Sequence, residues 1–289
     1  MSRRDCSPAD GARDKVQVDQ SRQSAATHTL VVGTTPLIIS VPHAGTGLPP
    51  ELAPQLTPLA LTMPDTDWYV DRLYDFAPAM GATMIVARHS RYLIDLNRPS
   101  DDAALYSAAP QTGLCPTHSF AGEPLYLDGR AAVTAAEVSR RCLHYWQPYH
   151  DSLQALLHET RARHGYAVLL DAHSIRSVVP RLFADRLPDI NVGTYDGRSC
   201  CGQINETLGR LLASAPRWSH VFDGRFKGGH ITRHYGQPSH GMHALQIELA
   251  QCSYMDESGA TYDARRAAPL RQVLKSVVES LLALPLAPA

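Results

Sequence analysis

Two histidines in this chain each follow a hydrophobic run that has the length of a β-strand. Residues 166–170 lead into an Asp-Ala-His-Ser motif that contains His173, and residues 37–41 lead into a Pro-His-Ala-Gly motif that contains His43. In an open α/β sheet, ligands bind at the carboxyl ends of the strands. Two imidazoles delivered to that edge can share a metal ion or move a proton. A single histidine would more often be structural, so the inference depends on the pair.

Two carboxylates, Asp65 and Asp67, stand at the start of a segment with helical periodicity, residues 67–79. Aspartate is a favoured helix N-cap, so capping alone would explain the pair. Capping and metal ligation are compatible, because one carboxylate can cap the helix while the other binds an ion. Both residues are therefore candidate metal ligands.

A strand predicted at residues 244–249 alternates apolar side chains with Gln246 and Glu248. The two polar side chains must share one face, because successive side chains of a strand point in opposite directions. A carboxylate that is half-buried on such a face has a raised pKa and can act as a general base. The alternative is a solvent-facing glutamate on a sheet with only one buried face.

Several arginines follow these motifs. Asn97 and Arg98 end a predicted strand at residues 92–96, Arg176 comes shortly after the second histidine, and Arg233 belongs to a basic segment with two glycines. A guanidinium matches a carboxylate through two parallel hydrogen bonds. In a chain whose net charge is −1, this density of cations indicates an anionic small molecule rather than a nucleic acid. A solvated charged loop with surface ion pairs is the alternative.

The composition is that of a globular protein. The chain has 289 residues, of which 44% are hydrophobic and 19% charged, enough to bury a large core. No apolar run approaches the roughly 20 residues of a membrane span, and no apolar segment follows the N-terminus as in a secretory signal. The 6 cysteines include no C-x-x-C pair, which favours reduced thiols and a cytoplasmic location. Motifs of serine hydrolases, P-loops and dinucleotide-binding folds are absent.

Strands alternating with helices predict an α/β fold with mixed or parallel strands. We expect a disordered extension over residues 1–27 and a single domain over residues 28–289. Strands are predicted at residues 30–32, 37–41, 83–87, 92–96, 166–170 and 244–249. Helices are predicted at residues 67–79, at 131–164 with a break near Pro148, at 203–213, and at 269–284 with Pro269 in the first turn. Residues 99–128 and 174–200 are predicted to be mainly loop.

Taken together and in order, the motifs resemble those of the N-formylglutamate amidohydrolase (N-formylglutamate deformylase) family. The motifs are SVPHAG at 40–45, DTDW at 65–68, SRYLIDLNRP at 90–99, DAHSIR at 171–176, RFKGGHITR at 225–233 and QIEL at 246–249. Each motif is short, but their number and order over residues 30–280 make the resemblance specific.

That family resembles zinc carboxypeptidases, which implies a mixed, largely parallel sheet sandwiched by helices (a phosphorylase/hydrolase-like fold). The resemblance further implies one Zn²⁺, or another divalent metal, held by His43, an acidic residue and His173. Zinc carboxypeptidases take a His and a Glu three residues apart as the first two ligands, whereas this chain has Thr46 at the second position. The acidic ligand must therefore come from elsewhere; Asp67 is our choice, with Asp65 as the alternative.

The resemblance also implies roles in catalysis and substrate binding. Asn97 and Arg98 are similar to a carboxypeptidase pair that holds a substrate carboxylate, and Arg176 or Arg233 would hold a second carboxylate. Glu248 stands where those enzymes carry their general base. The expected activity is hydrolysis of N-formyl-L-glutamate to formate and L-glutamate in histidine degradation, with no nucleic acid or membrane partner. The alternatives are a deacylase or amidase of another N-acyl amino acid, and a non-catalytic anion-binding module. The sequence sets no oligomeric state.

Overall fold

The computed structural model describes residues 27–104, 112–127 and 133–286. The expected disordered extension therefore lies outside the described residues, apart from residue 27, as does part of the long loop expected at 99–128. The division into an extension and one domain stays a prediction. None of the helices within the described ranges is long and apolar enough to span a bilayer.

The described residues form one seven-stranded sheet with the strand order β1-β3-β2-β4-β7-β5-β6. β1 is antiparallel to β3 and β5 is antiparallel to β7, while the other four pairings are parallel. The strands are β1 His28–Val31, β2 Leu37–Val41, β3 Thr83–Ala87, β4 Ala167–Ile175, β5 Ile190–Gly193, β6 His220–Phe222 and β7 Met242–Ala250. The predicted mixed, largely parallel sheet is confirmed.

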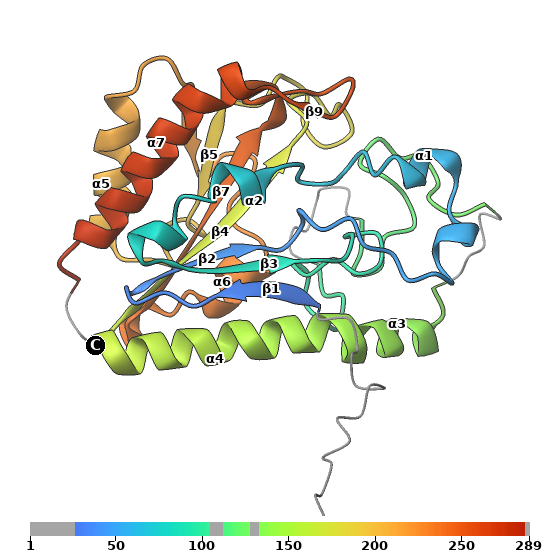
Figure 1. The fold of residues 1–289 in the computed structure, drawn as a ribbon, viewed down its shortest axis with the longest axis horizontal. Coiled ribbons are helices and arrows are strands. Elements are labelled where there is room, and N and C mark those ends of the chain that lie inside the picture. Colours follow the sequence, from blue (N-terminus) through green and yellow to red (C-terminus); the bar gives the residue numbers. More distant parts are fainter. Residues whose placement is uncertain (1–26, 105–111, 128–132, 287–289) are drawn as a thin grey trace, which may run out of the picture.

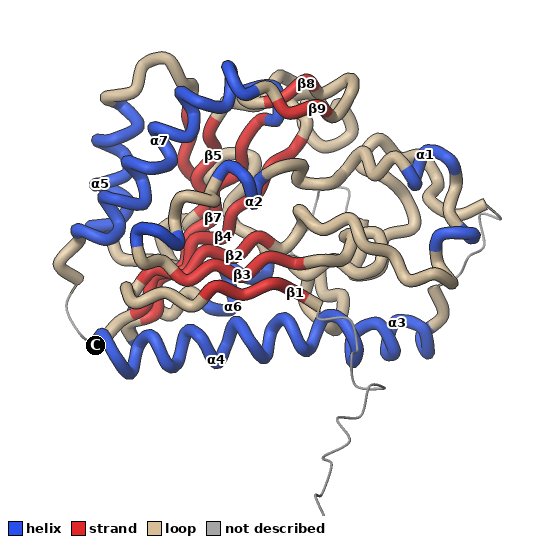
Figure 2. The backbone as a smooth tube through the Cα atoms, in the orientation of Figure 1, coloured by secondary structure: helices blue, strands red, loops and turns tan. Residues whose placement is uncertain are grey.

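Helices cover both faces of this sheet (Figure 1). Figure 2 shows α4 running along one side of the sheet, and α5 and α7 lying next to one another on the other side. The alternation within β2 explains the two layers, because Ile38 joins the apolar cluster on the α4 side while Ile39 joins the cluster beneath α5 and α7. The helices are α1 Pro58–Leu61, α2 Val70–Leu73, α3 Ala135–Arg141, α4 Gln147–His164, α5 Gly202–Ala213, α6 His230–Tyr235 and α7 Ala264–Ala283.

β4 extends five residues beyond the apolar run that predicted it. Asp171, His173 and Ser174 continue the strand because β7 pairs with them throughout, and all nine residues of β4 are buried. The polar motif thus lies within the sheet rather than in a loop after it. A two-stranded ribbon of β8 Met255–Asp256 and β9 Thr261–Tyr262 lies outside the main sheet.

Several predicted elements were wrong in extent or kind. Residues 92–96 form turns rather than a strand, since Leu93 donates to the Ser90 carbonyl and Asp95 donates to that of Leu114. The helix predicted at 67–79 is reduced to α2 and a 3-10 turn at Pro78–Met80. The loop predicted at 174–200 contains β5.

Neither predicted proline effect occurs. Pro148 lies in the first turn of α4, and a π-helical segment at Cys142–Trp146 joins α3 to α4 without a break. α7 begins at Ala264, because the Asp263 side chain accepts hydrogen bonds from the backbone N–H groups of residues 265 and 266. Pro269 therefore lies inside the helix rather than in its first turn.

Candidate active site

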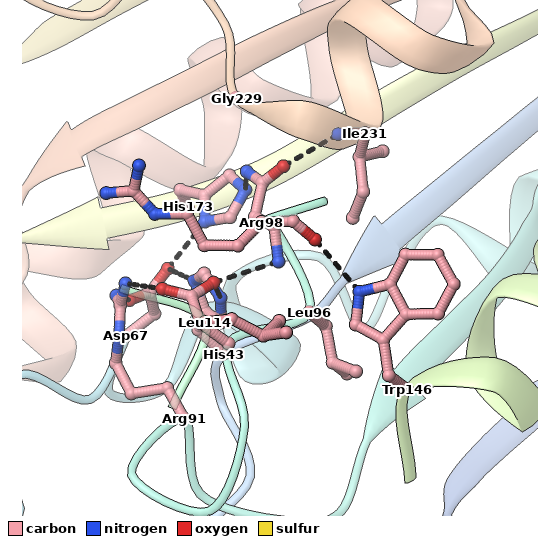
Figure 3. A network of polar contacts seen from close by, with 12 residues as sticks. His43, Asp67, Arg91, Leu96, Arg98, Leu114, Trp146, His173, Gly229 and Ile231 are labelled. Atoms are coloured by element: carbon pink, nitrogen blue, oxygen red, sulfur yellow. Dashed lines mark hydrogen bonds and ion pairs between the residues drawn. The ribbon is translucent and has the colours of Figure 1, made fainter. Parts of the chain in front are cut away.

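Three buried side chains from distant parts of the chain converge at the carboxyl edge of the sheet. His43 follows β2, Asp67 precedes α2 and His173 belongs to β4, and their candidate ligand atoms all lie within 4.8 Å of one another. The Asp67 Oδ2 atom lies 2.9 Å from His173 Nδ1 and 3.7 Å from His43 Nδ1. Figure 3 shows the three side chains facing a common point. This is the trio that the sequence proposed as ligands.

The trio fits a divalent cation. His43 Nδ1 and Asp67 Oδ1 are buried without a hydrogen-bond partner in the described part of the chain. Buried polar atoms are almost always paired, so two such atoms at one point indicate that a further group belongs there. Two imidazole nitrogens and one carboxylate form a donor set that zinc accepts, with a fourth position left for water.

A second carboxylate lies behind each histidine. His43 Nε2 is 2.8 Å from Asp95 Oδ1, and His173 Nε2 is 2.8 Å from Asp171 Oδ2. Such a carboxylate accepts a hydrogen bond from Nε2–H, which leaves the Nδ1 lone pair available to a metal and fixes the orientation of the ring. Asp95 and Asp171 were given no role from the sequence. For Asp171 a signal existed, since it lies two residues before His173 and must share its face of the strand.

These ion pairs dominate the protonation of the cluster. Burial alone would raise the pKa of Asp95, but Arg91 and His43 hold it well below its usual range. Burial alone would lower the pKa of His173, but Asp171 and Asp67 raise it well above its usual value. A cation that binds through His173 Nδ1 would compete with a proton for that atom, so binding is expected to release protons.

Glu248 occupies the position that its alternation with leucine and isoleucine predicted. Leu245 and Ile247 belong to an apolar core cluster, whereas Gln246 and Glu248 line a pocket beside the trio. The side chain is 6% exposed, and burial raises its pKa to about 8, although His173 acts to lower it. A carboxylate with this pKa is suited to accept a proton near neutral pH.

The pocket combines charged residues with an apolar wall of Phe120, Ile175, Leu182 and Phe226. Its remaining lining residues are His43, Asp67, Arg91, Asp95, Asn97, Arg98, Thr112, His173, Ser174, Arg225, Gly229, Gln246 and Glu248. Metal-ligand candidates, a general-base candidate and cations thus share one cavity, which suits a small anionic substrate.

Only one of the three arginines predicted to bind substrate lines this pocket. Arg98 does, whereas Arg176 is exposed and donates to the Glu257 carbonyl, and Arg233 donates from Nε to the Gly228 carbonyl. Two other arginines take their place in the lining. Arg91 bonds Asp95 at 2.6 Å, and Arg225 donates from Nε to the Leu182 carbonyl at 2.7 Å.

Comparisons with known proteins identify the family of this chain. The family model of N-formylglutamate amidohydrolase matches residues 35–255. The chain belongs to the N-formylglutamate amidohydrolase family. All six motifs quoted above fall within the matched residues, so the resemblance drawn from them is confirmed.

Relatives and solved structures of this family cover nearly the whole chain. N-formylglutamate deformylase of Pseudomonas aeruginosa is 51% identical over 252 residues, which are 87% of this chain and 94% of the relative. The deformylase of Pseudomonas putida is 48% identical over the same shares. The crystal structure of N-formylglutamate amidohydrolase from Ralstonia eutropha JMP134 has a TM-score of 0.78 at 25% identity, covering 89% of this chain and 97% of that one. Gene product Atu2144 from Agrobacterium tumefaciens has a TM-score of 0.67 at 17% identity and shares the fold.

Within this family member, Asn97 is part of an internal network. Its Oδ1 accepts from the Ile231 N–H, and its Nδ2 lies 3.0 Å from Asp171 Oδ2 and 2.9 Å from His173 Nε2. In Figure 3 the neighbouring Arg98 carbonyl accepts a hydrogen bond from the Trp146 indole. The Asn97-Arg98 segment is therefore held by contacts on both sides.

The alternative ligand Asp65 lies outside the trio. Its Oδ2 accepts hydrogen bonds from the Tyr92 hydroxyl and the Phe120 backbone N–H, and burial raises the pKa of this carboxyl. The structure thus gives Asp65 a role in holding the Phe120 loop against the pocket.

Proposed function

We propose that this chain hydrolyses N-formyl-L-glutamate to formate and L-glutamate with the help of one divalent metal ion, zinc by preference. The observation that carries the proposal is the buried trio of His43, Asp67 and His173, two of whose ligand atoms have no hydrogen-bond partner among the described residues, in a pocket lined by arginines. The choice of N-formyl-L-glutamate as the substrate rests on the relatives named N-formylglutamate deformylase. The resemblance to deformylases of histidine degradation supports the proposed setting, histidine breakdown in the cytoplasm.

In this proposal His43, Asp67 and His173 hold the metal. When bound, the ion would polarise the formyl carbonyl and lower the pKa of a water molecule. Asp95 and Asp171 keep the two imidazoles oriented through their Nε2 atoms, 2.8 Å away in both cases. Because these carboxylates accept hydrogen bonds from the Nε2–H groups, both Nδ1 atoms are presented to the ion.

Glu248 moves the proton. It accepts a proton from the water as the water oxygen attacks the formyl carbon, and then delivers that proton to the leaving amine. The C–N bond breaks at this step, releasing formate and the free amino group of glutamate. A pKa of about 8 falls when a cation lies nearby, so Glu248 would be ionised near neutral pH in the metal-bound enzyme.

Two of the lining arginines match the two carboxylates of the substrate. Arg91 lies 2.6 Å from Asp95 and 3.5 Å from Asp67, so it supports the metal trio. We assign one substrate carboxylate to Arg98 and the other to Arg225, in place of Arg176 or Arg233, because Arg98 and Arg225 line the pocket. The bond from Arg225 Nε to the Leu182 carbonyl orients that guanidinium at the apolar wall of the pocket.

A substrate panel assayed with and without a chelator tests the proposal. Comparing N-formyl-Glu with N-formyl-Gln, N-formyl-Glu α-amide and N-acetyl-Glu separates the two carboxylates and the acyl group. We expect N-formyl-Glu to be preferred by at least about tenfold over each amide, since one lost charge-assisted hydrogen bond costs about 1.5–3 kcal/mol. Chelation should abolish turnover and zinc should restore it. Preference for the N-acetyl compound would favour the other deacylase activity, and no turnover of any compound with metal present would favour the non-catalytic module.

Arg225 is tested within the same panel. Arg225→Met should remove the preference for one of the two carboxylates and leave the other preference intact. Arg217→Met is the matched control, because that arginine is exposed and stacks on Trp218 away from the pocket. If both preferences survive in Arg225→Met, the assignment of Arg225 is wrong even where the activity itself is established.

A further inference from the structure

A single glutamine side chain, Gln246, links the proposed base Glu248 to the Gly228-Gly229 turn, of which Gly229 lines the pocket. The Gly229 N–H donates to Gln246 Oε1 at 2.8 Å, and Gln246 Nε2 donates to Glu248 Oε2 at 3.0 Å. The amide orientation is unambiguous, because a backbone N–H can only donate and must therefore face the oxygen. Gln246 and Glu248 are 4% and 6% exposed, so these bonds are shielded from water.

The backbone is built to bring the turn within reach of Gln246. Gly193 of β5 is the register partner of Gln246, and a Cβ atom at Gly193 would lie 2.5 Å from the Gly228 nitrogen. Because Gly193 has no side chain, the Gly228-Gly229 turn can pack directly against β5. On its other side the turn packs on Asn97, which a Cβ atom at Gly229 would overlap. The turn is thus confined between the sheet and the segment that carries Arg98.

The two oxygens of Glu248 consequently differ. Oε2 accepts the bond from Gln246, whereas no hydrogen bond from the described residues reaches Oε1. On the opposing strand, His173 is the register partner of Glu248 and both residues line the pocket. The carboxylate is therefore held by one oxygen while the other remains available to a ligand of the pocket.

We propose that Gln246 is a positioning residue that makes Oε1 of Glu248 the proton-accepting oxygen. The inference rests on the proposed function, in which Glu248 is the general base. Without Gln246 the carboxylate can rotate about its last bond, so the two oxygens exchange and the reactive orientation is populated less. Misplacement of a reacting group by about 1 Å can cost about 100-fold in rate, and partial disorder of one carboxylate should cost about tenfold.

A double-mutant cycle tests this role. Gln246→Met and Glu248→Gln are made singly and together, and kcat, KM, metal content and melting temperature are measured with N-formyl-Glu. We expect Gln246→Met to lower kcat about tenfold with KM changed less than threefold and metal content unchanged. In the Glu248→Gln background the same substitution should cause less than a twofold further loss, because its target has already been removed. Should the Met variant fold poorly, Gln246→Asn, which shortens the side chain by one methylene, replaces it in the cycle.

Gln251→Met provides the matched control. Gln251 is a buried glutamine close by, but its Nε2 donates to the Thr66 carbonyl rather than to Glu248. Whatever its size, the loss of kcat caused by Gln251→Met should be the same in the wild-type and the Glu248→Gln backgrounds. Equal losses for Gln246→Met in the two backgrounds would overturn the positioning role, as would a loss of metal in that variant. If the wild-type protein does not hydrolyse N-formyl-Glu at all, the proposed function fails instead.

Discussion

His173 on β4 and Glu248 on β7 are register partners on neighbouring parallel strands, and both side chains point into one pocket. A candidate metal ligand and a candidate base are therefore held at a separation set by the hydrogen-bond ladder of the sheet. The two strands are buried along their full nine residues each. The geometry between the two groups is thus set by buried, continuously paired strands.

The metal trio can be tested by metal content. His43→Ala and His173→Ala should each lose bound zinc and activity together, because two remaining ligands hold zinc weakly. Asp67→Ala should behave alike, whereas Asp65→Asn should keep its metal. Elemental analysis of the purified variants checks this. Full occupancy in any of the three alanine variants would remove that residue from the ligand set.

Asp95 and Asp171 should affect metal affinity without being ligands. Asp95→Asn and Asp171→Asn keep the size of the side chain but lose the negative charge that strengthens the hydrogen bond from the histidine Nε2–H. Loss of such a partner typically lowers metal affinity about 10–100-fold. Competition with a chromogenic chelator measures this change, and Asp256→Asn, an exposed position on β8, serves as the control. Unchanged affinity in both variants would contradict the orienting role.

Arg98→Lys should lose much activity although the positive charge is kept. An ammonium cannot form the two parallel hydrogen bonds of a guanidinium with a carboxylate. We expect kcat/KM for N-formyl-Glu to fall about 10–100-fold, and to fall less for the amide that lacks the contacted carboxylate. An equal loss for every substrate would mean that Arg98 supports the structure of the loop instead.

Glu248→Gln should lower kcat by at least about 100-fold, since general-base catalysis contributes about 10²–10⁴-fold. Zinc content and melting temperature should stay close to those of the wild type, because size and hydrogen bonding are kept. Glu248 must lose its proton to act, so the acid limb of the pH–rate profile should shift or vanish in the variant. A variant that retains more than about a tenth of the wild-type kcat would exclude Glu248 as the base.

Because His150 is buried as a neutral ring, we expect the free energy of unfolding to fall in mild acid. Its ring stacks on Trp146 and bonds the Tyr235 hydroxyl and the Leu96 carbonyl, and burial lowers its pKa to about 3. In the unfolded chain the pKa of His150 is near 6.5, so as the pH falls the unfolded state binds a proton at His150 before the folded state does. The contribution of the neutral ring is therefore complete above pH 6.5 and is lost as the pH falls toward 3.

From pH 7 to pH 5 this loss amounts to about 2 kcal/mol. Denaturant unfolding at the two pH values measures it. His150→Gln should reduce the difference between the two pH values by about that amount, whatever its effect at pH 7. His158→Gln, an exposed position on the same helix, should leave the difference unchanged. An unaltered difference in His150→Gln would assign the acid sensitivity to other buried histidines.

The parts of the fold that could be predicted were strands whose own side-chain pattern, either alternation or an apolar run, sets their position. The alternation around Glu248 placed it in the pocket, and the apolar run of β2 placed His43 at the edge of the sheet. Residues 92–96 misled because their apolar side chains are buried by turns, which leave no periodic trace. α7 began earlier than predicted because the Asp263 cap decided its start.

The site followed the same division. The histidines that follow apolar runs could be proposed from the sequence, and Asp67 was proposed from its motif. Asp95 could not, since irregular backbone carries it to His43 and no local pattern pairs the two. The arginines were the least predictable, because loop conformation decides which of several cationic side chains faces the pocket. Arg225 and Arg233 lie eight positions apart in one basic segment, yet only Arg225 lines the pocket.

The location of the arginines on loops has a consequence for how this protein can change. β4 and β7 tolerate little substitution, because every residue on them is buried. Arg98, Arg225 and Leu182 instead line the pocket from connecting segments. Selection for activity on a different N-acyl amino acid should therefore favour substitutions near Arg98, Leu182 and Arg225 and leave both strands unchanged. The reaction would stay constant while the range of accepted substrates evolves around it.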